Sequence, residues 1–147
     1  MRSKSPLALR EQVIMVLVFA LAAALCLQVF AFSSQSSRRN AAVDRAVTLC
    51  QTAAENLKAA GGDMPNAQDA AMEHMGGTVS QGLWQVLYDE DWNVLTGWDG
   101  CVYRLEAQGV PTPVEGLCQA RVWVTAEGED EPLFSLTVAW QEVGDDG

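Results

Sequence analysis

Residues 10–32 read REQVIMVLVFALAAALCLQVFAF, and the 20 of them from Val13 to Phe32 contain one polar residue, Gln28. A helix rises about 1.5 Å per residue, so this run extends about 30 Å, the thickness of the hydrocarbon core of a bilayer. A helix in the core of a soluble protein of this size has a polar face, which this run lacks. We predict a transmembrane helix over residues 13–32, preceded by a short basic tail over residues 1–12.

Charge is divided unevenly along the chain of 147 residues. Residues 1–40 carry five basic residues and one acid, a net charge of +4, whereas residues 41–147 carry four basic and 18 acidic residues, a net charge of −14. A domain this acidic repels phosphate, which argues against nucleic acid as a partner. The basic tail favours an inside N-terminus and an extracytoplasmic acidic domain, although Arg38 and Arg39 behind the helix reduce that bias.

A second apolar pattern begins after residues 33–37 (SSQSS), which are either a linker or polar turns of a continuing helix. Apolar residues then recur at spacings of three and four, which predicts an amphipathic helix. The stripe consists of Val43, Ala46, Val47, Cys50, Ala53, Ala54 and Leu57. Gly61-Gly62 should end this helix, because glycine readily adopts a left-handed conformation. Residues 33–61 are thus a juxtamembrane segment and an amphipathic helix.

Residues 62–82 are expected to connect this helix to a sheet. Within them Asn66 resembles an N-cap for a short helix from Ala67 to about Met75, closed by Gly76-Gly77.

From Leu83 onward apolar residues recur at every second position, which is the period of a half-buried strand. Four such runs, near residues 83–88, 101–107, 118–125 and 134–141, are separated by turn-forming sequences. Short links favour an antiparallel meander, so residues 83–147 should form a β-meander with an acidic C-terminal tail. The predicted fold class is α+β: a transmembrane helix that continues into an amphipathic helix packed on a four-stranded antiparallel sheet.

The layout as a whole resembles type IV pilins and pseudopilins of type II secretion. The resemblance rests on the basic leader, on Glu11 at the start of the apolar helix, on the amphipathic continuation and on the C-terminal sheet. In that family the acid is the fifth residue of the mature chain and pairs with the N-terminal amine of a neighbouring subunit. The resemblance therefore implies that Glu11 is an assembly residue and that Leu7 would be the first mature residue. An ionised carboxylate in lipid is costly unless paired, so such a pair selects one register between subunits. The alternative is that Glu11 is an interfacial residue whose charge Arg10 offsets.

The chain departs from the family pattern at the cleavage site. Pro6 stands where the leader peptidase expects glycine, Leu7 stands in place of phenylalanine, and Arg10 is charged where an apolar residue is common. This combination is typical of a subunit that is not processed, or of a minor component. Two alternatives remain: an uncleaved signal anchor, and a cleaved secretory signal peptide with a small-x-small site at Val29-Phe30-Ala31, although the apolar run exceeds the about 7 to 15 residues usual for the latter.

No group of residues predicts an enzyme, a cofactor or a bound metal. The single histidine, His74, is expected to be solvated, and Cys50 lies on the buried stripe, so a Cys–His pair is not expected. Residues 89–93 (DEDWN) open like a calcium loop, but Val94 stands where the loop needs glycine and Gly100 where it needs glutamate. We interpret this segment as an acidic turn.

The remaining cysteines are expected to be free thiols. Cys26 lies in the apolar run, and Cys101 and Cys118 start neighbouring antiparallel strands, which places them on the order of 20 Å apart, far beyond the about 7 Å limit for a disulfide. Cys50 is the residue that could reach either of them, and an extracytoplasmic location permits a bridge. We expect Cys50, Cys101 and Cys118 to be buried and unpaired.

Five tryptophans are divided between the predicted core and the predicted surface. Trp84 and Trp140 follow the inward alternation of their strands. Trp123 follows the outward alternation, and Trp92 and Trp98 flank the first turn. A contact surface is predicted from Trp92, Trp98, Trp123 and Arg121, with partial burial under loops as the alternative.

Two functions fit the sequence. The first is a non-enzymatic, pilin-like structural subunit of a bacterial cell-surface filament or secretion apparatus, with the lipid bilayer and other envelope assembly proteins as partners. The second is a single-pass, membrane-anchored extracytoplasmic binding module that uses the outer face of its sheet.

Overall fold

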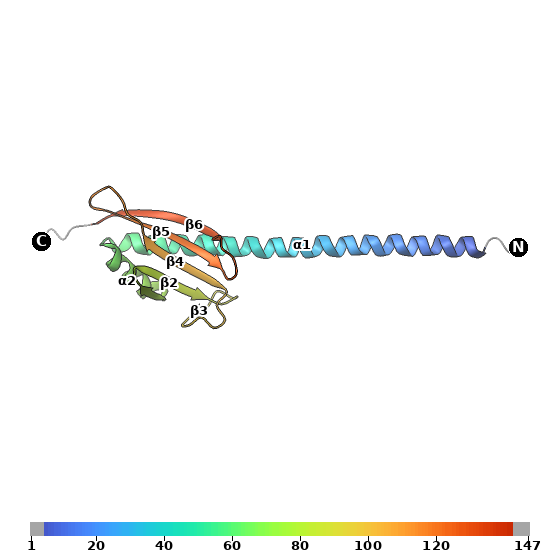
Figure 1. Cartoon of the computed structure of the whole chain (residues 1–147), viewed down its shortest axis with the longest axis horizontal. Helices are drawn as coiled ribbons and strands as arrows, with labels where there is room; N and C mark the ends of the chain where they lie inside the picture. The colour runs from blue at the N-terminus through green and yellow to red at the C-terminus, as the bar shows by residue number, and fades with distance from the viewer. Residues whose placement is uncertain (1–4, 143–147) are drawn as a thin grey trace. The chain divides into compact units, whose positions relative to one another are not determined.

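The structure, a computed structural model, describes residues 5–142, with side chains from Pro6 onward. Figure 1 shows an α+β chain with one long helix, α1 (Ser5–Ala60), a short helix, α2 (Met64–Met75), and an antiparallel sheet. Arg2 and Lys4 of the basic tail, and residues 143–147 of the acidic tail, lie outside the described residues. The chain forms two units, Met1–Ala41 and Ala42–Gly147.

The described part of the first unit is helical throughout. Its side chains from Pro6 to Ser33 are exposed on every side of α1, and the helix is long and apolar enough near its N-terminus to span a membrane, judged by length and composition. The polar residues 33–37 continue α1 without a break. Of the two expectations for that segment, the continuing helix is therefore correct.

The second unit begins with the amphipathic part of α1. The predicted stripe is confirmed at Ala46, Cys50, Ala53 and Leu57, each fully buried, whereas Val43 is only half-buried. Most of these side chains are small, so the helix backbone can approach the sheet closely. Helix α1 ends at Ala60 as predicted, and the next residue, Gly61, has a φ of +61°.

Helix α2 begins earlier than the sequence pattern suggested. Its N-cap is Asp63, whose side chain accepts a hydrogen bond of 3.0 Å from the backbone N–H of Asn66. The prediction of Asn66 as the cap is wrong because Pro65 belongs to the first turn of the helix, where its missing N–H costs nothing. Gly76 closes α2 and His74 is exposed, both as predicted.

The sheet contains six strands rather than four. They are β1 (Thr78–Ser80), β2 (Leu83–Tyr88), β3 (Val94–Leu95), β4 (Tyr103–Gly109), β5 (Leu117–Ala126) and β6 (Phe134–Gln141). The strand order in the sheet is β1-β2-β4-β5-β6, and β3 also pairs with β2. The predicted meander corresponds to β2, β4, β5 and β6, which are neighbours in that order. The two additional strands have three and two residues, too few to display an alternation of period two.

Alternation along the strands directs the apolar side chains toward α1. Trp84, Val86, Leu105 and Val122 are fully buried and belong to one core cluster with Leu57 of the helix. This is the core that the period-two pattern predicted.

The two core tryptophans also fasten the ends of the helices to the sheet. The Trp140 indole N–H donates to the carbonyl oxygen of Gly62 at 2.8 Å, just after α1. The Trp84 indole N–H donates to the carbonyl oxygen of Gly76 at 3.0 Å, just after α2. A buried indole N–H left without a partner would be costly, so these bonds fix where each helix ends over the sheet.

Candidate interaction surface

We call the side of the sheet away from α1 the outer face, and its central residues come from β2, β4 and β5. They are Gln85, Arg104, Glu106, Arg121 and Trp123. The strand register places Gln85 opposite Glu106 and Glu106 opposite Trp123. Side chains that are opposite one another on the same face of a sheet are close enough to interact, so these three form one row across three strands.

Glu106 is the central residue of that row and is half-buried. The side-chain amide of Gln85 donates to Oε1 of Glu106 at 2.9 Å, and the indole N–H of Trp123 donates to Oε2 at 2.9 Å. Both carboxylate oxygens therefore have a donor, and hydrogen bonds to a charged acceptor are the stronger kind. The row is consequently fixed in orientation rather than free to rotate.

Two arginine–tryptophan pairs flank the row. The guanidinium carbon of Arg121 lies 5.4 Å from the ring centre of Trp123, and that of Arg104 lies 5.6 Å from the ring centre of Trp98. Both distances suit a cation–π interaction. These arginines are two of the four basic residues in a region with 18 acids, so the outer face carries positive charge in a strongly acidic domain.

The structure brings three of the four predicted contact residues to this area. Arg121 is exposed, Trp123 is half-buried, and Trp98 is 60% exposed. Trp92 lies elsewhere: its ring stacks on Tyr103 with 3.8 Å between ring centres and packs against the core.

Sequence reasoning did not include Gln85, Arg104 and Glu106 in the surface. Their outward alternation was visible in the sequence, but the register that makes them neighbours was not.

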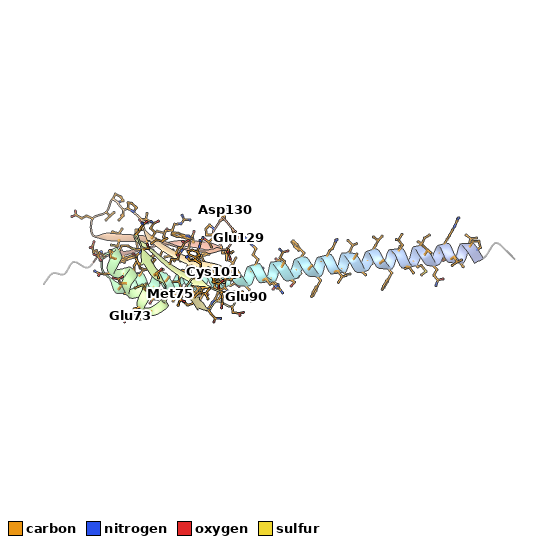
Figure 2. All side chains as sticks on the ribbon, turned by 60° about the horizontal axis from the view of Figure 1, so that its bottom comes forward. Glu73, Met75, Glu90, Cys101, Glu129 and Asp130 are labelled. Atoms are coloured by element: carbon orange, nitrogen blue, oxygen red, sulfur yellow. The ribbon has the colours of Figure 1, made fainter. Side chains whose placement is uncertain are left out.

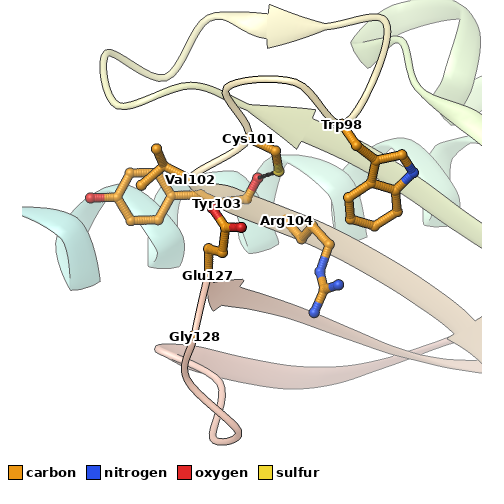
Figure 3. A pocket seen from close by; sticks show the side chains of 7 residues that line it. All are labelled: Trp98, Cys101, Val102, Tyr103, Arg104, Glu127 and Gly128. Atoms are coloured by element: carbon orange, nitrogen blue, oxygen red, sulfur yellow. Dashed lines mark hydrogen bonds between the residues drawn. The ribbon is translucent and has the colours of Figure 1, made fainter.

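Two hollows of the second unit include residues of this surface in their lining. A pocket of about 110 Å³ is lined by Trp98, Cys101, Arg104 and Glu127, among others, and Figure 3 shows these side chains. Its volume is small beside the about 300 Å³ or more of a typical ligand site. A groove of about 360 Å³ runs past Gln85, Leu87 and Trp98, and none of its lining residues is ionisable. Trp98 borders both hollows.

The acidic turns lie together at one end of the sheet. Tyr88, Tyr103 and Ala126 are in register, so the turn after β2 and the turn after β5 are at the same end, as the positions of Glu90, Glu129 and Asp130 in Figure 2 show. Among residues 5–142 no three histidine, cysteine or acidic side chains gather closely enough to hold a metal ion.

Asp89 in the first of these turns has a structural use. Its Oδ1 accepts hydrogen bonds of 2.9 Å from the backbone N–H groups of Asp91 and Asn93, and its Oδ2 accepts one of 3.1 Å from the Asn93 side chain. The backbone N–H of Asn93 is the main reason that the pKa of Asp89 lies below its usual value. This carboxylate closes the turn, as the acidic-turn interpretation requires.

The cysteines of the described residues are free thiols that differ in burial. Cys50 and Cys101 are buried free thiols, Cys118 is a half-buried one, and Cys26 is exposed on α1. Burial raises the pKa of Cys50 to about 12, and burial likewise raises the pKa values of Cys101 and Cys118. A reactive thiol needs a lowered pKa, so none of these three is activated as a nucleophile.

Glu11, the predicted assembly residue, lies on the exposed surface of α1 in the first unit, near the start of the apolar run. Comparisons with models of known protein families, with characterised proteins and with solved structures found no match to this chain.

Proposed function

We propose that this chain is a non-enzymatic, single-pass membrane subunit that resembles pilins and pseudopilins and assembles into a bacterial envelope filament or secretion apparatus. The observation that supports this best is the change in the surface of one continuous helix. Helix α1 is exposed and apolar on all sides over residues 13–32, and it carries a single buried stripe from Ala42 to Leu57. Such a helix suits lipid or neighbouring helices in one part and a protein core in the other.

Glu11 is the residue that gives this proposal a specific test. An acidic side chain within or beside a membrane helix is costly unless it finds a partner. A positively charged group of a neighbouring subunit would offset that cost and would fix the register between the two helices. In this arrangement the sheet domain lies outside the cell and the N-terminus inside.

The first test replaces Glu11 in the full-length chain in its native membrane. Glu11→Ala and Glu11→Gln should both abolish recovery of the chain in high-molecular-weight assemblies while leaving its total amount unchanged. Gln12→Ala is the matched control, because it alters a polar neighbour on the same turn without removing charge. Assembly of the Glu11 variants at the level of the unaltered chain would refute the proposal.

The second test determines where the mature chain starts. Intact mass and N-terminal sequencing of protein from its native membrane should give a start at Leu7 if it is processed, or at Met1 if Pro6 blocks cleavage. A start near Phe32 would remove the anchor and leave a secreted domain, which contradicts the membrane proposal.

The alternative is a membrane-anchored binding module, and the two arginine–tryptophan pairs of the outer face support it. They offer flat, partly exposed aromatic surface with positive charge, which fits an acidic or aromatic partner. Under this alternative Arg104→Ala combined with Arg121→Ala should abolish partner capture at low ionic strength, whereas Lys58→Ala on the exposed side of α1 should not. Normal assembly of the Glu11 variants, together with loss of partner capture in the double arginine variant, would favour the binding module over the assembly subunit.

A further inference from the structure

The two edges of the sheet differ in a way that neither proposed function uses. One edge is formed by β1 and β3, strands of three and two residues that both pair with β2. The other is formed by β6, a strand of eight residues whose only strand partner among residues 5–142 is β5, and Figure 1 shows it as the outermost strand. Soluble proteins protect sheet edges by keeping them short or by placing charge, proline or a bulge on them. The β1 edge has the first kind of protection.

The β6 edge has no charge, proline or bulge within residues 134–141. Residues 134–141 read FSLTVAWQ, with no charged residue and no proline, in a region that contains 18 acids. The nearest acids are Glu131 before the strand and Glu142 after it. Four side chains on the outer side of this strand are small or neutral and exposed: Ser135, Thr137, Ala139 and Gln141.

The hydrogen-bond pattern shows which backbone groups are free at this edge. The N–H of Glu142 donates to the carbonyl oxygen of Gly116 at 2.9 Å, and Leu117 is in register with Gln141. Hydrogen-bonded pairs alternate along an antiparallel ladder, so the even-numbered residues of β6 direct their backbone groups toward β5. The N–H and C=O groups of Ser135, Thr137, Ala139 and Gln141 therefore point away from the sheet.

We propose that β6 pairs edge to edge with β6 of a second copy of this chain, antiparallel about a two-fold axis that passes beside Thr137. The pairing of residues about this axis favours the strand's own copy as the partner. Thr137 then faces Thr137 of the second copy, and Ser135 faces Ala139, so the free backbone groups of these three residues pair with one another. On the inner side the half-buried Phe134 lies opposite Trp140, whose ring is already buried in the core of its own copy.

This register also places like charges at both ends of the shared ladder, because Glu142 of one copy comes next to Glu131 of the other. Repulsion between exposed carboxylates is screened by salt. The association should therefore be weak at low ionic strength and should strengthen as salt is added. The proposal concerns the sheet alone and does not rest on Glu11 or on the membrane.

The register is tested by cross-linking the full-length chain in detergent with a short bifunctional maleimide, in a background in which the exposed Cys26 is replaced by alanine. Thr137→Cys should cross-link to itself. Ser135→Cys and Ala139→Cys should not cross-link alone but should do so when the two variants are mixed. Equal cross-linking of all three single variants, or none at Thr137→Cys, would overturn the register.

The backbone contribution is tested by measuring the dissociation constant of the dimer by sedimentation. Thr137→Pro removes an N–H that points away from β5, so the domain should keep its circular dichroism spectrum while the dissociation constant rises at least tenfold, from the loss of hydrogen bonds worth about 1 kcal/mol each. Thr137→Val keeps the N–H and should dimerise like the unaltered chain. A dimer that is equally stable with Thr137→Pro would be held together by α1 instead, and that result would overturn the edge proposal without affecting the one for Glu11.

Discussion

At the scale of single residues, Glu106 is the side chain on which the outer face depends. Replacing it by alanine leaves the Gln85 amide and the half-buried Trp123 indole without their acceptor. We expect Glu106→Ala to lower the free energy of unfolding by about 1–2 kcal/mol. Trp123→Phe removes the indole N–H that donates to Glu106, so no buried donor is left without an acceptor. The hydrogen-bond contribution to the loss of unfolding free energy should therefore be smaller than for Glu106→Ala.

A double-mutant cycle between Glu106→Ala and Trp123→Phe, measured by urea denaturation, checks this prediction. A coupling of about 0.5–1.5 kcal/mol is expected for a hydrogen bond of this kind. Coupling indistinguishable from zero would show that the two side chains do not interact in solution.

Asp89 makes the stability of the domain depend on pH. Its carboxylate is stabilised by the hydrogen bonds in its turn, chiefly from the N–H of Asn93, and its pKa is lowered in the folded state. The stabilisation is fully present above the pKa of an unfolded aspartate, about 3.9, and it is lost as the pH falls through the lower pKa of the folded state.

Asp89→Asn should therefore be less stable than the unaltered chain at neutral pH, and the difference should vanish in strong acid. Thermal unfolding followed by circular dichroism across pH measures this, with the exposed Glu90→Gln as the matched control. A difference that stays constant down to the lowest pH would show that ionisation of Asp89 is not involved.

At the scale of elements, the β1–β2 hairpin depends on two glycines that play different parts. Both have positive φ, +91° at Gly77 and +78° at Gly82. A Cβ on Gly77 would clash with the carbonyl oxygen of Gln85, whereas one on Gly82 would meet nothing within 4 Å. Gly82→Ala should lower the free energy of unfolding by about 1–2 kcal/mol, from backbone strain alone.

Gly77→Ala should cost about 3 kcal/mol or more, because the same strain is joined by a clash with the backbone of β2. Chemical denaturation of the two variants side by side checks the contrast. Equal losses would mean that β1 does not approach β2 as closely as the structure has it.

At the scale of the whole molecule, the second unit contains a core that includes the last part of α1. Cys50, Ala53 and Leu57 are fully buried in the same cluster as Trp84 and Leu105. A chain that begins at Arg38 should fold in aqueous buffer, whereas one that begins at Gly62 should not, because the apolar face of its sheet would be uncovered. Circular dichroism and cooperative melting of the two chains test this, and cooperative melting of the shorter chain would contradict it.

The sequence by itself determined the elements whose periodicity is long and regular. The apolar run from Val13, the helical stripe ending at Leu57 and the four alternating strands were all predicted, and Gly61 marked the end of α1, because each pattern reflects only which face of one element avoids water. The inward alternation likewise identified Trp84 and Trp140 as core residues.

The tertiary structure alone decided what depends on pairing between distant segments. The row of Gln85, Glu106 and Trp123 exists only because the strand register brings them together. Trp92 is not part of the predicted contact surface because its ring stacks on Tyr103. Strands β1 and β3 are too short to have a period, so only their hydrogen bonds to β2 define them. Register, edges and side-chain neighbours follow from contacts between residues far apart in the chain, and no local pattern specifies those.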